Sequence, residues 1–572
     1  MVNINEYANF IWSVADTLRG DYKQADYGKV ILPLTVIRRL DSVLSDTKEN
    51  VLKSYESQKI TNLQEADLVL NKIAGYKFHN HSKFDFSKLI SDPDNIASNL
   101  RNYINGFSQN ARDILENFKF EEEIKTLDKA NLLYQVVKQF QEINLHPSKI
   151  NNHEMGYLFE ELIRKFAEAS NETAGEHFTP REVIKLMVNI LFISDSNILR
   201  GDGIIKTLYD PACGTGGMMS VAEEYLKELN PDARLELFGQ EINPESYAVC
   251  KSDMLIKVQD PDHVKLGDTL RDDQLRTEKF DYMLSNPPFG VNWKKAEKEV
   301  KQEYEDLGFG GRFGAGLPSI SDGSMLFLQH MVSKMKPTNG GSRLAIVFNG
   351  SPLFSGSAGS GPSEIRRWII ENDMLEAIVA LPDQLFYNTG ISTYIWVVTN
   401  RKPTERKGKI HLINAVSFFK KMSKSLGNKR HEIGPDDMDK IVSLYGDFKE
   451  SKFSKVFDNN DFGYSQITVE RPTVDEKREA IKDAKGKPKA DPKLRDTENV
   501  PLKENIQKYF EREVKPFVPD AWIDETKTKV GYEINFTKFF YEYKPLRSLE
   551  EITKDILELE KESDGLLKNI LD

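Results

Sequence analysis

Apolar residues recur at helical spacing through the first quarter of the chain, and strand-like alternation is scarce there. One early set is Tyr7, Ile11, Val14 and Leu18, and a later one is Leu133, Val136, Val137 and Phe140. Intervals of three and four residues place such side chains on one face of a helix. The pattern therefore predicts a helical amino-terminal domain over residues 1–147.

From residue 148 to residue 472 short apolar runs alternate with helical patterns, which is typical of an α/β domain. The seven runs that we expect to form strands are 204–209, 235–239, 263–266, 280–284, 343–348, 375–381 and 392–398. Only residues 382–391 separate the last two runs, which is short for a helical crossover and favours an antiparallel pair. The predicted fold class is α/β, with a Rossmann-like seven-stranded mixed sheet.

The first four of these runs each end in a turn or a polar residue. A glycine-rich turn that begins with an acid follows the first run, Glu241 ends the second, Asp268 follows the third and Asn286 follows the fourth. Open α/β sheets bind ligands at the carboxyl ends of their strands, and glycines there let the backbone approach the ligand. The candidate ligand-binding residues of the first turn are Asp210, Ala212, Gly214, Thr215, Gly216 and Gly217. We expect Glu241 to accept hydrogen bonds from ribose hydroxyls and Asp268 to accept one from an adenine amino group.

The fourth run ends at Asn286-Pro287-Pro288-Phe289, where two prolines force the chain out of the sheet. The side-chain carbonyl of Asn286 and the main-chain carbonyls beside it can accept both hydrogens of one amino group. Such acceptors localise the lone pair of an exocyclic amine on its nitrogen, and Phe289 offers a flat face on which a base can stack. These four residues are the candidate catalytic stretch. The plainer interpretation is a strand-ending turn with an Asn cap.

Another candidate stretch precedes the first strand and consists of Glu176, His177, Phe178, Thr179, Pro180 and Arg181. Its Thr-Pro pair predicts a helix over 182–191, with Thr179 as the N-cap and Pro180 at the first helical position. Because the amides at a helix start suit a carboxylate, we expect this loop to bind the methionine end of a cofactor.

Composition narrows the classes of function. Lys and Arg number 78 against 89 Asp and Glu, for a net charge of −11, whereas a protein that grips DNA alone has clustered basic residues. Either the basic residues gather on one face, or a partner supplies much of the DNA affinity. No Gly-Lys-Ser or Gly-Lys-Thr occurs in the chain, which argues against a P-loop ATPase.

Cysteine usage and the hydropathy pattern bear on the compartment. The two cysteines form no CxxC pair and no histidine cluster has metal spacing, which predicts a reducing cytoplasm and no metal site. The chain has neither an apolar run of about 18 residues nor a basic-then-apolar leader, so we expect no membrane span and no secretion.

The order of these motifs resembles that of the modification (methyltransferase) subunit of type I restriction-modification systems, as do residues 32–41 and 530–534. In that family the loop at 176–181, the turn at 215–217 and the acid at Glu241 bind S-adenosylmethionine. The motif that begins at Asn286 receives a flipped adenine. The resemblance implies an S-adenosylmethionine-dependent methyltransferase sheet that methylates N6 of adenine in DNA.

The same resemblance implies partners. They are DNA, a specificity subunit that is joined by two copies of this chain and chooses the sequence, and a separate ATP-dependent restriction subunit. Two alternatives stay open: methylation of an RNA guanine or a protein glutamine, and a non-catalytic scaffold with the same fold.

The remaining segments are less informative. Residues 473–515 are dense in charge and predict a linker, and residues 516–572 predict a helical region for partner docking. The apolar positions of that last region are Leu549, Ile552, Ile556 and Leu559. The segment 293–324, which includes the glycine-rich stretch 308–316, is consistent with a mobile DNA-facing loop or with an ordinary surface excursion.

Overall fold

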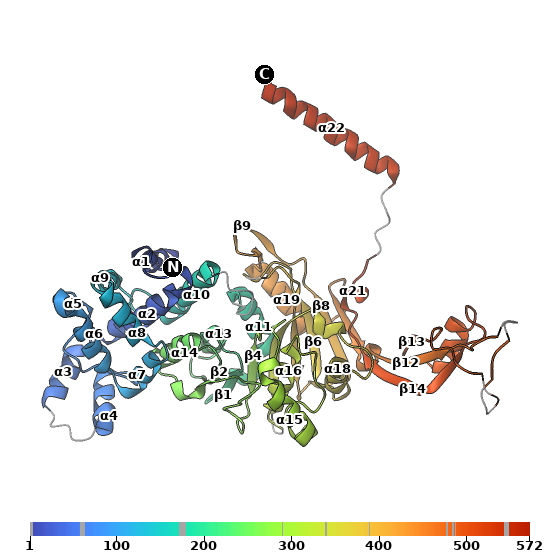
Figure 1. Ribbon diagram of the computed structural model, residues 1–572, viewed down its shortest axis with the longest axis horizontal. Coiled ribbons are helices and arrows are strands. Elements are labelled where there is room, and N and C mark those ends of the chain that lie inside the picture. The colour runs from blue at the N-terminus through green and yellow to red at the C-terminus, as the bar shows by residue number, and fades with distance from the viewer. Residues whose placement is uncertain are drawn as a thin grey trace. The chain divides into compact units, whose positions relative to one another are not determined.

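The computed structural model describes residues 4–57, 63–170, 179–288, 290–337, 340–387, 389–475, 479–482, 486, 488–542 and 548–571. The chain divides into two compact units, Met1–Ile534 and Asn535–Asp572 (Figure 1). The first unit contains the helical region, the large sheet and the cavity.

The amino-terminal region is helical, as the spacing of apolar residues predicts. Its helices are α1 (Ile4–Leu18), α2 (Tyr27–Leu44), α3 (Lys48–Ser57), α4 (Leu63–Ala74), α5 (Phe86–Leu89), α6 (Ile96–Asn105), α7 (Gln109–Glu116), α8 (Phe120–Lys129) and α9 (Leu133–Glu142). Helix α2 is the centre of this region, since its side chains are buried along almost its whole length.

One apolar core crosses the predicted boundary at residue 147. Residues of α10 (Asn152–Ser170) and α14 (Pro244–Ile256) belong to the same buried cluster as α1 and α2. Arg39 of α2 is buried and donates to the carbonyl of Ile150 at 2.8 Å and to Asn152 Oδ1 at 2.6 Å. The helical region therefore packs directly on the elements that frame the first two strands.

A nine-stranded mixed sheet forms the centre of the catalytic region, in the order β11-β8-β6-β7-β5-β4-β1-β2-β3. Its strands are β1 (Ile205–Asp210), β2 (Arg234–Glu241), β3 (Val264–Leu266), β4 (Tyr282–Ser285), β5 (Arg343–Asn349), β6 (Leu375–Ala380), β7 (Thr393–Thr399), β8 (Lys409–Asn414) and β11 (Ser454–Asp458). All seven predicted strands are present, and β6 pairs antiparallel with β7 as expected. The predicted count of seven was too low because β8 and β11 carry His, Asn, Lys and Asp among their apolar residues.

Strand direction brings the functional segments together. The parallel pairs are β1–β2, β1–β4, β2–β3, β4–β5 and β6–β8, whereas β7 runs antiparallel to β5 and β6. The chain consequently leaves β1, β2, β3, β4, β5, β6 and β8 from the same side of the sheet, which we call the carboxyl edge.

Helices cover both faces of this sheet. Leu208 of β1 packs in one cluster with α11 (Arg181–Ile193) and α13 (Gly217–Leu229). The next residue, Tyr209, points to the other face, where its hydroxyl lies 3.0 Å from His330 Nε2 on α16 (Ser324–Ser333). The alternation along β1 thus supports a doubly wound arrangement.

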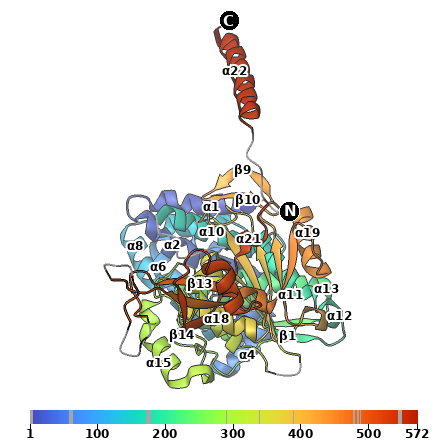
Figure 2. The same ribbon diagram turned by 90° about the vertical axis from the view of Figure 1, so that its right-hand side faces the viewer.

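The predicted linker 473–515 and the predicted helical region from 516 were wrong over much of their length. A second, three-stranded antiparallel sheet contains β12 (Gly463–Glu470), β13 (Asp496–Pro501) and β14 (Trp522–Tyr532) (Figure 2). Its small core includes Val500, Phe510 and Ala521, together with Ile467 and Val469. Charged residues alternate with these few apolar ones, so the composition resembles that of a solvated linker although the segment folds.

The second unit contains α21 (Phe536–Phe539) and the long helix α22 (Leu549–Leu571). The helical spacing from Leu549 onward predicted this helix. Leu549, Ile556 and Leu559 have exposed fractions of 83%, 59% and 64%, so these three apolar side chains are not buried within their own unit.

Two features are absent from the described part of the chain. None of the described helices combines the length and apolar character needed to cross a membrane. Likewise, no group of three or more His, Cys, Asp and Glu side chains within the described ranges is arranged to hold a metal ion.

Arg366 on α18 (Gly361–Glu371) joins the two sheets and generates a stability prediction. It is fully buried and donates to the carbonyls of Tyr532 at 2.6 Å, Pro352 at 3.0 Å and Ser355 at 2.8 Å. We expect Arg366→Met to lower the free energy of unfolding in urea by about 2–4 kcal/mol, because three buried carbonyls lose their donor.

The neighbouring Arg367 is the matched control, since it forms exposed pairs with Glu364 and Glu371. Arg367→Met should change the free energy of unfolding by less than about 1 kcal/mol. Equal effects of the two substitutions would show that Arg366 does not join the sheets in the way described.

Candidate active site

A cavity of about 550 Å³ opens at the carboxyl edge. The turns after β1, β2, β3 and β4 line it, and α10 and the segment 291–296 close it from the sides. The predicted site residues that line it are Thr179, Asp210, Ala212, Gly214, Thr215, Gly217, Glu241, Asp268, Asn286 and Pro288. Segments that are distant in sequence therefore converge on one space large enough for a nucleoside-sized ligand.

Asp210 begins the glycine-rich turn at the tip of β1. Its Oδ1 accepts from the amide of Ala212 and from Ser285 Oγ, both at 3.0 Å. Burial raises the pKa of Asp210 to about 7, and the nearby charge of Glu241 acts in the same direction, against the two hydrogen bonds. The Ser285 contact fixes the tip of β4 against the tip of β1.

The turn itself needs glycine at two positions. Gly214 and Gly216 have φ angles of +53° and +85°, which side-chain-bearing residues rarely adopt. A Cβ atom on Gly216 would lie 2.9 Å from Cys250 Sγ, whereas one on Gly214 would meet no atom within 4 Å. Gly216 is therefore packed against the protein, and the backbone at Gly214 is open on its cavity side.

Glu241 and Asp268 organise the turns that carry them. Glu241 Oε2 accepts from the amide of Gly214 and Oε1 from that of Asn243, both at 2.8 Å. Asp268 Oδ1 accepts from the amide of Leu270 at 3.0 Å. Because a carboxylate oxygen accepts more than one hydrogen bond, both acids can also serve a ligand in the cavity.

The loop before α11 differs from its prediction by one residue. Helix α11 begins at Arg181 and Pro180 is its N-cap, so Thr179 lies one position before the cap and Pro180 is not the first helical residue. The Thr179 hydroxyl is used elsewhere, because its Oγ1 accepts from Asn286 Nδ2 at 2.9 Å. The loop and the catalytic stretch therefore meet directly.

Arg181 stabilises the loop that makes this contact between Thr179 and Asn286. It is buried, pairs with Glu160 at 2.7 Å and lies 4.3 Å from the centre of the Tyr157 ring. Glu160 in turn lines the cavity beside Gly217. Arg181 thus binds protein groups on α10, whereas the sequence predicted that it contacts the cofactor.

The catalytic stretch lies at the cavity wall. Asn286 is buried at the end of β4, Pro287 is buried behind it and Pro288 lines the cavity. Four of the predicted site residues lie outside the described residues: Glu176, His177, Phe178 and Phe289.

Sequence reasoning missed several lining residues. The additional ones include Glu160, Asn243, Trp293, Lys295 and Phe327. Asn243 accepts from the amides of Glu245 and Ser246 and caps α14, and an Asn-Pro pair after Glu241 is a local signal that could have indicated it. The other four arrive from helices and loops without a local motif.

The segment 293–324 is packed, which favours the ordinary surface excursion over a mobile loop. It contains α15 (Glu297–Leu307) and a small core with Trp293, Val300 and Phe313. Arg312 pairs with Glu303 at 2.7 Å and donates to the carbonyls of Thr269 at 2.7 Å and Leu270 at 2.9 Å. This segment forms one side of the cavity.

The residues present fit S-adenosylmethionine. The open backbone at Gly214 can approach a ligand closely, Glu241 and Asp268 are acceptors for hydroxyl and amino groups, and apolar side chains of Leu270 and Phe327 line the same space.

Comparison with known proteins agrees with this geometry. The family model described as N-6 DNA Methylase matches residues 150–478, and that of the HsdM N-terminal domain matches residues 7–140. The Type I restriction enzyme MjaIX methylase subunit of Methanocaldococcus jannaschii is 26% identical over 494 residues, covering 82% of this chain and 81% of that protein. The Type I restriction enzyme HindI methylase subunit of Haemophilus influenzae is 30% identical over 263 residues, covering 46% of this chain and 54% of that protein.

Solved structures show the same fold. A type I restriction-modification system methyltransferase subunit from Streptococcus thermophilus has a TM-score of 0.63 at 22% identity, covering 80% of this chain and 97% of that chain. The N-6 DNA methylase match alone extends over more than half of the sequence. The chain therefore belongs to the N-6 DNA methylase family, among the methylase subunits of type I restriction-modification systems.

Proposed function

We propose that this DNA adenine methyltransferase transfers the methyl group of S-adenosylmethionine to N6 of an adenine that is flipped out of DNA. The observation that carries the proposal is the contact between Asn286 and Thr179 at the wall of a cavity that the glycine turn, Glu241 and Asp268 also line. A carbonyl acceptor for an amine and a nucleoside-sized site thus share one space.

The roles of the residues follow from their positions. When bound, S-adenosylmethionine supplies an electrophilic methyl group. Glu241 and Asp268 are the candidate acceptors for its ribose and adenine, and the turn at 214–217 lies against it. Pro180 and Arg181 support the loop that ends in Thr179. Glu176, His177 and Phe178 stay predictions for the methionine end.

The orientation of the Asn286 side chain activates the amine of the target adenine. Because Asn286 Nδ2 donates to Thr179 Oγ1, the side-chain amide is held with its carbonyl on the opposite side. That carbonyl and the main-chain carbonyls of Asn286 and Pro287 accept the two hydrogens of adenine N6, which localises the lone pair on nitrogen. Phe289 is the candidate stacking residue for the flipped base. The site also accelerates methyl transfer because it aligns the adenine amine with the methyl group and excludes water.

The proposal also includes the assembly in which the chain works. We infer that the chain works with DNA and a specificity subunit, two copies per specificity subunit, in the cytoplasm, and that a separate ATP-dependent subunit cleaves DNA. The exposed apolar positions of α22 are the candidate docking surface for the specificity subunit.

The first prediction from the proposed function concerns methyl transfer, which is measured by incubating labelled S-adenosylmethionine with DNA and the chain, with and without its specificity subunit. We expect label on adenine N6 that depends on the specificity subunit. Asn286→Ala should lose at least about 100-fold in transfer, because one acceptor for the amine is removed, and should still bind S-adenosylmethionine.

Other outcomes would contradict the proposal. Label on RNA or protein would assign the site to a guanine or glutamine amine instead. Binding of S-adenosylmethionine without transfer to any of these acceptors would indicate a non-catalytic scaffold.

The second prediction concerns Thr179, which positions Asn286. Thr179→Val removes the acceptor for Asn286 Nδ2 and should lower kcat by about 10- to 100-fold, the rate equivalent of one lost hydrogen bond. Thr179→Ser keeps the hydroxyl and should restore kcat to within about 3-fold of the parent. If both variants lose kcat equally, the hydroxyl does not position Asn286.

The third prediction concerns the pH dependence that Asp210 introduces. Its pKa of about 7 lies above the ordinary value of about 3.9, so its contribution to stability is present at low pH and is lost as pH rises through 7. Asp210→Asn keeps an acceptor oxygen and does not titrate. Its free energy of unfolding relative to the parent should therefore rise by about 2–3 kcal/mol from about pH 5 to about pH 8. Parallel profiles for the two proteins would show that Asp210 does not titrate in this range.

A further inference from the structure

A small two-stranded antiparallel sheet stands apart from the main one. Strands β9 (Lys420–Leu426) and β10 (Lys429–Glu432) form a hairpin between β8 and α19 (Pro435–Asp447). It projects from the surface in both views (Figures 1 and 2). Because β8 runs parallel to β6 and so ends at the carboxyl edge, the hairpin leaves the sheet on the same side as Asn286.

The hairpin concentrates positive charge in an acidic chain. Four of its cationic side chains are exposed: Lys420, Lys421, Lys424 and Arg430. In the part of the chain that the structure describes, no acidic partner is found for any of these four. Strand β9 does not alternate between buried and exposed positions, so its residues do not cover a core. Like charges on neighbouring residues repel one another, and a polyanion would relieve that repulsion.

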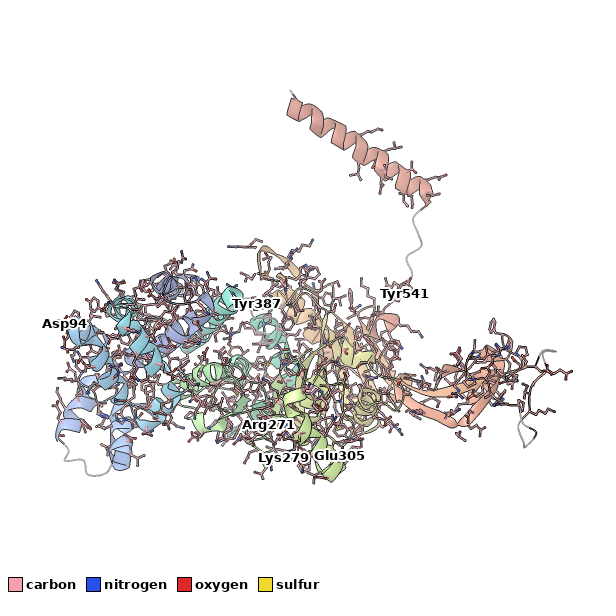
Figure 3. All side chains as sticks on the ribbon, viewed as in Figure 1. Asp94, Arg271, Lys279, Glu305, Tyr387 and Tyr541 are labelled. Atoms are coloured by element: carbon pink, nitrogen blue, oxygen red, sulfur yellow. The ribbon has the colours of Figure 1, made fainter. Side chains whose placement is uncertain are left out.

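The fifth cation of the hairpin, Lys429, is buried and anchors it. Its Nζ pairs with Glu182 Oε1 and donates to the carbonyls of Leu385 and His431, both at 3.0 Å. The amide of Asn428 donates to the carbonyl of Tyr387 at 2.8 Å, and Figure 3 labels Tyr387. The hairpin is thus held against the segment that follows β6 and against the start of α11.

Further contacts make the anchor rigid. His431 lies in stacking distance of Phe419, with ring centres 3.9 Å apart, and its Nδ1 is 2.9 Å from the carbonyl of Asp383. The amide of Arg430 donates to the carbonyl of Gln384 at 2.9 Å. The exposed cations therefore project from a fixed platform.

This platform is connected to the active site. Glu182, the partner of Lys429, lies three residues after Thr179, which contacts Asn286. Along the carboxyl edge β8 is four strands away from β4. At a strand spacing of about 4.8 Å the base of the hairpin lies roughly 19 Å from the adenine site.

We propose that the β9–β10 hairpin binds the phosphate backbone of the DNA that flanks the flipped adenine. Duplex DNA carries one negative charge per about 1.7 Å of its axis, so a duplex presented to Asn286 has phosphates at that distance. The inference rests on the proposed function, because only a DNA substrate at Asn286 brings phosphates there. It assigns to this chain, in addition to the specificity subunit, a share of the DNA affinity.

The test uses the complex of the full chain with its specificity subunit and a duplex that this complex methylates. A variant replaces Lys420, Lys421, Lys424 and Arg430 by Gln. The matched control replaces four exposed lysines of the amino-terminal helices and loops, Lys53, Lys72, Lys77 and Lys83, by Gln. DNA affinity is measured by fluorescence anisotropy between about 50 and 200 mM salt.

We expect the hairpin variant to bind DNA more weakly and with a shallower salt dependence. Each lost phosphate contact should reduce the slope of log affinity against log salt by about 0.9, so the loss of two or more contacts should reduce it by about 2 or more. The KM for DNA should rise in parallel, while binding of S-adenosylmethionine reports that the variant is folded. The control variant, and a variant with Lys420, Lys421 and Lys424 replaced by Arg, should keep the parent's slope.

Three outcomes would overturn the proposal. The hairpin variant could show the parent's affinity and slope, or it could lose affinity only to the same extent as the control. It could also keep its DNA affinity but fail to assemble with the specificity subunit on a sizing column, which would make the hairpin a protein interface. Absence of methylation by the unmodified complex would instead refute the proposed function, so the two failures are distinguishable.

Discussion

The parallel register of β1 against β2 and β4 is the constraint on which the active site depends. Asp210 lies beside Gly239 of β2, and Leu208 beside Tyr282 of β4, so the three strands end within two residues of one another. The hydrogen bond from Ser285 Oγ to Asp210 then fixes the last residue of β4 to the glycine turn. A slip of one residue in either pairing would turn the strand's side chains to the opposite face and separate Asn286 from the cavity.

This constraint explains which parts of the fold could be predicted from sequence. The strands β4, β5, β6 and β7 are buried on both faces, so their sequences are largely apolar and are recognisable as strands. Strands β13 and β14 contribute few residues to a core and consist mostly of polar residues such as Asp, Glu, Lys and Thr, with isolated apolar ones such as Val500 and Ile523. Local composition could not distinguish them from a solvated linker, because both strands are stabilised by pairing with β12, which is a separate segment of the chain.

The residues of the candidate site also divide into those that the sequence could indicate and those that it could not. Residues at strand tips, such as Asp210, Glu241 and Asn286, have a signal in the sequence because a polar residue directly follows an apolar run. Glu160 and Trp293 have none, because they come from α10 and from a loop whose position depends on tertiary packing. The Thr-Pro pattern predicted that Thr179 is the N-cap of a helix. In the structure its hydroxyl instead accepts a hydrogen bond from Asn286, which is more than 100 residues away in sequence. Long-range hydrogen bonds of this kind are not encoded in any short motif.

The net charge of the whole chain does not describe the charge of each part of its surface. A net charge of −11 left two explanations for DNA binding, namely a basic face or a partner. The structure contains a local concentration of exposed cations on β9 and β10, and it pairs the remaining hairpin cation, Lys429, with Glu182 in the interior. Since charges farther apart than about 8–10 Å are largely screened at physiological salt, phosphates respond to the nearest few side chains and not to the net charge of the chain. An acidic protein can therefore present a basic surface to DNA at the edge where its active site opens.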